Sequence, residues 1–224
     1  MMPTMAAVYP STLSAVSPSS TRSQDGVGGR SRAAALAVSA VAGLTLGVLT
    51  QLGQSRLPEA LHSLVNSAAP WVLVAFAVAL LGRTGPVAGV CAVLSLAASE
   101  IGYVATAATE GYGSAPTTVV FWLSAALFFG PLVGLAAYFW RTRATPWGGL
   151  GGGLVAGFVG GEGLAAYLTV RGTTSGAYWI AQVLVGLALL AFVGRRTSFG
   201  WAMAAFAIGV GLLLATRSAS LAGA

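Results

Sequence analysis

Long apolar runs separated by short arginine-bearing turns constrain this sequence more than any other feature. A helix needs about 20 mostly apolar residues to cross a bilayer. Six runs are of about that length: Ala33–Leu52, Pro86–Ala108, Thr118–Trp140, Trp147–Val170, Ala177–Gly194 and Phe199–Thr216. A seventh, Ala68–Gly82, is shorter and has Pro70 near its start. The pattern predicts an all-α fold, a polytopic bundle of about seven transmembrane helices.

Composition supports a membrane location. Of the 224 residues only 7% are charged, whereas soluble domains carry roughly 25%. Too few polar groups are present to cover a water-facing surface.

The chain is predicted to have three parts. We expect residues 1–32, which are rich in Ser, Pro, Thr and Gly, to form a disordered cytoplasmic tail. Residues 33–217 form the helical bundle, and residues 218–224 form a short C-terminal tail.

The arginines predict an orientation, because basic residues gather in cytoplasmic loops. With seven spans, alternate loops place eight arginines on one side: Arg22, Arg30, Arg32, Arg83, Arg141, Arg143, Arg195 and Arg196. The other side has three: Arg56, Arg171 and Arg217. The N-terminus is therefore predicted to be cytoplasmic. Since membrane orientation explains the arginines, a nucleic-acid partner is not expected.

Two acidic residues lie inside predicted spans. Glu100 and Glu162 are each roughly 21–22 Å along their helices from the inner boundary of a core about 30 Å thick, and Gln182 enters the membrane near the same level. Intramembrane acids usually face a partner or a water-filled cavity. One interpretation is an outward-facing polar pocket lined by Glu100, Glu162 and Gln182. The other is that each acid bonds its own neighbours and holds helices together.

Glycine spacing predicts how the fifth predicted span, Trp147–Val170, packs. Gly149, Gly153, Gly157 and Gly161 form consecutive GxxxG steps, which let two helices approach closely. Glu162 points to nearly the opposite side of this helix. We expect the helix to be central, with its glycine face against another helix of the chain.

Enzyme chemistry is not expected. Cys91 is the only cysteine and His62 the only histidine, so there is no disulfide framework and no Cys-based metal site. No metal, cofactor or catalytic residue is predicted.

Four stretches carry a resemblance to a known family: "NSAAPW" (Asn66–Trp71), "EGYGSAPTTVVFW" (Glu110–Trp122), "GPLVGLA" (Gly130–Ala136) and "GGEGLAAY" (Gly160–Tyr167). The chain resembles actinobacterial multi-pass membrane proteins about 200 residues long that form a domain of unknown function. The resemblance covers Ala33 to Arg217. It implies a bacterial plasma-membrane location, and it carries over no activity or functional residue.

Two functional hypotheses remain open. In the first, the chain binds or transports a small solute or cation through the outward polar pocket. In the second, it is a non-catalytic scaffold or assembly partner, whose glycine faces dock helices of another membrane protein. A pocket holding both glutamates would favour the first, and separated glutamates bonded to their own neighbours would favour the second.

Overall fold

The structure is a computed structural model that describes residues 21–142, 146–170, 172 and 174–222, with side chains between Ser31 and Leu214. It consists of helices joined by short connections, in the order α1 (Thr21–Arg56), a 3₁₀ turn (Glu59–Leu61), α2 (His62–Val65), α3 (Ala69–Ala79), α4 (Gly85–Thr109), α5 (Pro116–Thr142), α6 (Trp147–Val170), α7 (Gly176–Arg196) and α8 (Phe199–Ala222). The described part contains no strand. The all-α prediction is confirmed for these residues.

Five helices are long and apolar enough to cross a membrane: residues Ser31–Arg56 of α1, and α4, α5, α6 and α7. The other two predicted spans correspond to shorter apolar helices, Ala69–Ala79 and Phe199–Leu214. Eleven residues of α-helix extend about 16 Å, roughly half of a 30 Å hydrocarbon core. Helix α3 is therefore too short to cross alone, and five long apolar helices are what the structure establishes.

The first helix begins earlier than its apolar run. Residues 1–20 of the predicted tail lie outside the described residues, but α1 begins at Thr21 and continues without interruption to Arg56. The connection between α1 and α3 forms a 3₁₀ turn and the four-residue helix α2. Pro58 precedes this turn in an extended conformation, φ −58° and ψ 149°.

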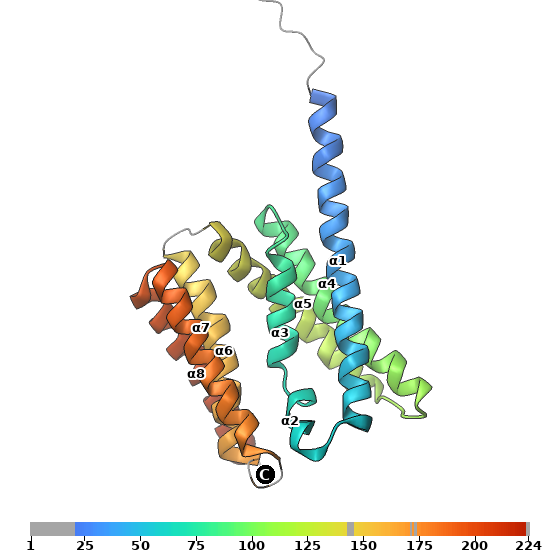
Figure 1. Cartoon of the computed structure of the whole chain (residues 1–224), viewed down its shortest axis with the longest axis vertical. Coiled ribbons are helices and arrows are strands. Elements are labelled where there is room, and N and C mark those ends of the chain that lie inside the picture. Colours follow the sequence, from blue (N-terminus) through green and yellow to red (C-terminus); the bar gives the residue numbers. More distant parts are fainter. Residues whose placement is uncertain (1–20, 143–145, 171, 173, 223–224) are drawn as a thin grey trace, which may run out of the picture.

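The helices form two groups (Figure 1). Helices α1, α3, α4 and α5 pack together, with α4 against both α1 and α5, while α6 packs along α7 and α8. The α5–α6 contact joins the groups, and α3 also touches α6. The α3–α4 and α7–α8 turns lie at the same end as the start of α1, whereas α1, α4 and α6 finish at the opposite end (Figure 1).

Small residues let these helices approach closely. The core of the first group is mostly alanine: Ala35, Ala75, Ala79, Ala88, Ala92 and Ala137, with Cys91. On α1, a Cβ added to Gly43 would lie 3.0 Å from the Cβ of Ala98 and even closer to the backbone of Ser95. Backbones this close leave no room for side chains at the crossing.

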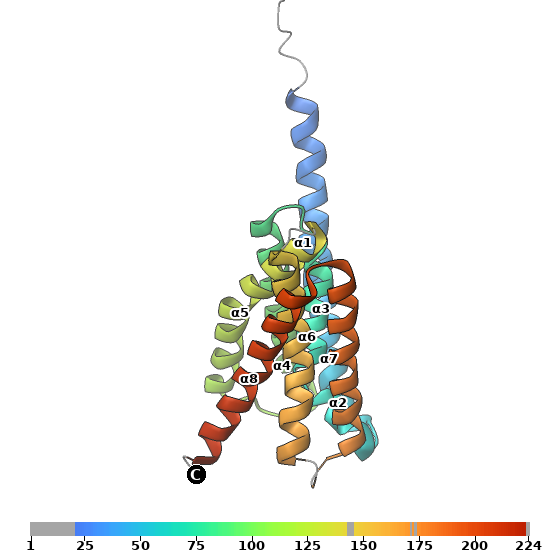
Figure 2. The ribbon, with the colours of Figure 1, turned by 90° about the vertical axis from the view of Figure 1, so that its left-hand side faces the viewer.

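Helix α6 shows the same packing, and the prediction for its glycine face is confirmed. Its face of Gly149, Gly153, Gly157 and Gly161 lies against α8, which crosses it obliquely (Figure 2). A Cβ on Gly157 would lie 2.6 Å from the carbonyl oxygen of Phe206 and 2.8 Å from its Cα. On other sides Gly151 meets Ala136 of α5, and Gly163 meets α7. Helix α6 is therefore central within the described bundle.

Gly157→Ala should lower the melting temperature in detergent, since the new methyl group meets the backbone of Phe206 and the two helices must separate. Gly211→Ala on α8 is the matched control, because nothing lies within 4 Å of a Cβ at that helical position and alanine favours the helix by about 1 kcal/mol. Equal melting temperatures for the two variants would contradict close packing of α6 on α8.

Candidate functional site

Two polar assemblies lie toward the end of the bundle opposite the start of α1, and only one includes residues singled out from the sequence. The first is centred on Glu162 of α6 and is here called the Glu162 cluster (Ser67, Ala68, Ala69, Glu162 and Gln182). The second surrounds a cavity between the ends of α1 and α4, here called the α1–α4 cavity.

The carboxylate of Glu162 caps the start of α3. Its Oε1 accepts a hydrogen bond from the backbone N–H of Ala68 at 2.7 Å, and its Oε2 accepts one from the N–H of Ala69 at 2.9 Å. The first N–H groups of a helix have no partner within it, and negative charge is favoured at this end. Pro70 follows at a position that needs no N–H donor. Glu162 therefore supplies the cap that Ala68, the N-cap residue, lacks.

Two side chains complete the cluster. Oε2 of Glu162 also accepts hydrogen bonds from the hydroxyl of Ser67 and from Nε2 of Gln182, both at 2.8 Å. Gln182 is buried on α7 and donates as well to the carbonyl oxygen of Val159, at 3.1 Å. Its Oε1 lies 3.1 Å from the Ser67 hydroxyl. The cluster thus joins α3, α6 and α7, which belong to different helix groups.

The structure brings Glu162 and Gln182 together, but it does not bring Glu100 into the cluster. Glu100 is buried on α4, with 4% of its surface exposed. Within the described residues its carboxyl group has no hydrogen bond, and none connects it to Glu162 or Gln182. Equal depth along two helices does not ensure that their side chains meet. Whether any of the three binds a solute stays a prediction.

The α1–α4 cavity has a volume of about 310 Å³. Its lining comes from the end of α1, the end of α4 and the connection to α5: Gln51, Gln54, Ser55, Tyr103, Ala107, Tyr112, Gly113 and Ser114. Most of these side chains are polar, and the volume is at the lower end of the range for ligand pockets, about 300–1,000 Å³. Glu100, Glu162 and Gln182 are not part of this lining.

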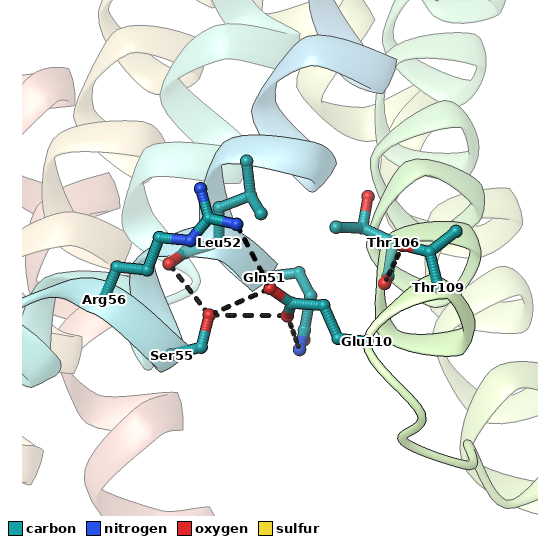
Figure 3. A network of polar contacts seen from close by, with 7 residues as sticks. All are labelled: Gln51, Leu52, Ser55, Arg56, Thr106, Thr109 and Glu110. Carbon is teal, nitrogen blue, oxygen red and sulfur yellow. Dashed lines mark hydrogen bonds and ion pairs between the residues drawn. The ribbon is translucent and has the colours of Figure 1, made fainter.

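A carboxylate stands beside this cavity. Glu110, the C-cap residue of α4, accepts hydrogen bonds from Nε2 of Gln51 at 3.3 Å and from the Ser55 hydroxyl at 3.2 Å (Figure 3). The guanidinium of Arg56 lies 3.7 Å from it (Figure 3). Because 69% of the Arg56 side chain is exposed, this ion pair contributes little stability. Glu110 instead connects the ends of α1 and α4.

Tyr103 is held in place by its neighbours. Its hydroxyl donates a hydrogen bond to Oε1 of Gln54 at 2.8 Å, and its ring lies 6.4 Å from that of Trp71 on α3. The Trp71 indole N–H in turn donates to the hydroxyl of Thr50, at 3.3 Å. This wall of the cavity is therefore ordered by contacts among α1, α3 and α4.

A glycine-dependent turn forms the rim. The N–H of Gly111 donates to the carbonyl of Ala108 at 3.2 Å, and that of Tyr112 to Ala107 at 2.9 Å. These two bonds, with Gly111 at φ +83°, define a Schellman motif, for which glycine is the preferred residue. The turn ends α4 and directs the chain across the cavity, so that Tyr112, Gly113 and Ser114 line it.

Gln51 leaves one group without a partner. Its side chain lines the cavity with 4% of its surface exposed, and within the described residues its Oε1 has no hydrogen bond. A buried acceptor without a donor costs about 1–3 kcal/mol. The site residues predicted from the sequence do not include those of this cavity, although Gln51, Gln54 and Ser55 follow i, i+3, i+4 spacing and so share one face of α1. That spacing is the signal that could have found it.

The described residues offer no obvious metal site, because no three His, Cys, Asp or Glu side chains gather among them. The molecule is thus a helical protein with several membrane-compatible apolar helices and a polar cavity at one end. The chain belongs to the family of unknown function DUF6518, whose model matches residues 28–224. Searches of curated proteins and of solved structures found no match.

Glu162→Ala should destabilise the protein by at least about 1–3 kcal/mol, the cost of one unsatisfied buried donor, because the N–H of Ala68 loses its acceptor. The donors of Ala69, Ser67 and Gln182 each lose one of two acceptors. Glu162→Gln should have a smaller effect, because it keeps one acceptor oxygen but turns an NH₂ group toward the backbone donors. Melting temperatures in detergent measure both. Glu59→Gln, at an exposed position, is the control. The cap would be disproved if Glu162→Gln were as stable as this control.

Proposed function

We propose that this chain is a multi-pass protein of the bacterial plasma membrane that binds a small polar solute, as a binding or transport component. The α1–α4 cavity is the proposed binding site, in place of a pocket around Glu100, Glu162 and Gln182. The observation that carries the proposal is the buried Gln51 amide, whose Oε1 has no donor among the described residues and which lines an open polar cavity.

The lining indicates what kind of solute would fit. Gln51 offers an acceptor, Tyr112 and Ser114 offer hydroxyl groups, and the nearby Glu110 carries a negative charge that Arg56 offsets only in part. A solute with N–H or O–H donors would pair with the hydroxyl oxygens of Tyr112 and Ser114, and it would reach the buried Gln51 oxygen after a small rotation of that side chain. The aromatic faces of Tyr103 and Tyr112 suit a small organic molecule better than a bare metal ion. The proposed role is binding, without catalysis.

The scaffold hypothesis has less support. It requires glycine-rich faces that are free to dock another protein, whereas the glycine face of α6 packs against α8 of the same chain. Glu100 and Glu162 are separated, and Glu162 bonds its own neighbours, which is the outcome that favours the scaffold hypothesis on the criterion given by the sequence. The Glu162 cluster, however, explains internal stability without any partner. The α1–α4 cavity, by contrast, has no structural role that would account for it.

Ligand binding can be tested by thermal shift. Purified full-length protein would be screened in detergent against amino acids, amines, polyols and nucleosides, since a ligand at about 100 times its Kd stabilises by about 2.7 kcal/mol. A stabilising solute should lose its effect in Gln51→Leu and in Tyr112→Ala. Phe121→Ala is the matched control, because it removes a similarly exposed aromatic side chain, 62% against 59%, outside the cavity lining. A shift that survives both cavity variants would place the ligand elsewhere.

We also propose seven membrane segments, with α3 and its flanking turns completing one crossing and the N-terminus in the cytoplasm. Glu59 and Thr84 are exposed on either side of α3, while Cys91 is fully buried and should not react. In intact cells, an impermeant maleimide should therefore label Glu59→Cys but not Thr84→Cys until the membrane is permeabilised. Labelling of both would mean that this segment does not cross, and the reverse pattern would invert the orientation.

A further inference from the structure

A second cavity lies at the other end of the bundle, where the arginines gather. Its volume is about 250 Å³, and Leu80, Trp140, Arg141 and Arg196 line it; we call it the arginine cavity. Leu80 follows the end of α3, Trp140 and Arg141 belong to the last turns of α5, and Arg196 ends α7. The cavity therefore lies where three helix ends from both helix groups converge.

Within the described residues, no acidic side chain pairs with either guanidinium group of this cavity. The ion pair found in the described residues joins Arg56 to Glu110, and neither Arg141 nor Arg196 has one there. The acidic side chains that the structure describes, Glu59, Glu100, Glu110 and Glu162, lie on other elements. The carbonyl ends of the helices carry about half a negative charge each, which offsets only part of the two full positive charges.

Aromatic contacts position one of these arginines. The Cζ atom of Arg196 lies 4.5 Å from the centre of the Phe192 ring, and that ring lies 5.6 Å from Trp140 of α5. A guanidinium over an aromatic face makes a favourable cation–π contact. Contacts from Trp140 to Phe192 and from Phe192 to Arg196 thus connect α5 to α7, and they hold a cation beside an apolar surface.

This combination fits a phosphate group attached to an apolar molecule. Arginine binds phosphate oxygens through paired hydrogen bonds, and tryptophan favours the boundary between membrane and water. Basic pockets between helices at the cytoplasmic side bind the head groups of anionic lipids. Leu80 and Trp140 offer the apolar floor that the glycerol and upper acyl carbons of such a lipid would contact.

We propose that the arginine cavity binds the phosphate of an anionic phospholipid, with Arg141 and Arg196 as its ligands. The lipid then bridges the two helix groups at the end opposite the Glu162 cluster. The proposal depends on membrane insertion but not on solute binding in the α1–α4 cavity, since the two cavities share no residue. Failure of one leaves the other unaffected.

The test is a lipid titration of the purified full-length protein, followed by native mass spectrometry in detergent. Phosphatidylglycerol should bind more tightly than the zwitterionic phosphatidylcholine. The double variant Arg141→Gln, Arg196→Gln should bind phosphatidylglycerol about 30-fold more weakly, from the usual contribution of two basic residues near anionic lipid. The matched control is Arg83→Gln, Arg195→Gln, which removes two exposed arginines from the same end outside the cavity.

Three results would overturn the proposal. They are equal affinity for the two lipids, undiminished binding by the cavity variant, and an equal loss in the control variant, which would indicate a diffuse charge effect.

Two further measurements refine the assignment. The double variant Arg141→Lys, Arg196→Lys keeps both charges, and its affinity for phosphatidylglycerol should lie between those of the parent and the glutamine variant, because lysine lacks the planar fork. A separate titration with inorganic phosphate distinguishes the source. Saturation by phosphate alone, with displacement of the lipid, would assign the cavity to a soluble anion instead.

Discussion

The arrangement of the bundle depends on the hydrogen bonds by which a carboxylate on α6 caps the start of α3. Helix α3 begins inside the bundle, where Ala69 is buried. Apart from the Ser67 hydroxyl near the N–H of Ala69, the Glu162 carboxylate is the acceptor that its first N–H groups find among the described residues. In a bilayer such groups must be satisfied by protein, because the hydrocarbon core holds no water. Glu162 meets this need with bonds of 2.7 and 2.9 Å. The same carboxylate binds Ser67 and Gln182, so it joins the two helix groups as well as stabilising one helix end.

Small residues bring the other helices of the cluster close to Glu162. Helix α6 packs tightly on its neighbours because it has glycine on several of its faces. Gly163 lies against α7 beside Gln182, and Gly160 lies against Gly186. The polar cluster and the glycine contacts therefore depend on each other. Close packing positions the carboxylate, and its hydrogen bonds oppose separation of the helices.

The two ends of the molecule differ in chemistry. At one end, polar side chains line a cavity within the first helix group, and the Glu110 carboxylate lies beside it. The buried Gln51 oxygen there has no donor in the described structure. At the other, two arginines and a tryptophan surround a cavity between the groups. Water-soluble polar molecules suit the first cavity, and phosphate on an apolar body suits the second.

The sequence by itself determined where the main helices lie, since each predicted apolar run overlaps one observed helix, although α1 begins earlier and α3 is shorter than its run. The glycine face of α6 packs as its spacing predicts. The sequence also placed Glu162 opposite that face. Only the tertiary structure decided what Glu162 binds, because Ala68 lies 94 residues earlier and its backbone N–H leaves no trace in the pattern of side chains. Likewise, Glu100 shares the predicted depth of Glu162 but not its cluster. The α1–α4 cavity forms only because the ends of these two helices meet. Periodicity specifies the faces of one helix, whereas the rotation, depth and contacts of each helix relative to the others are set by packing between them.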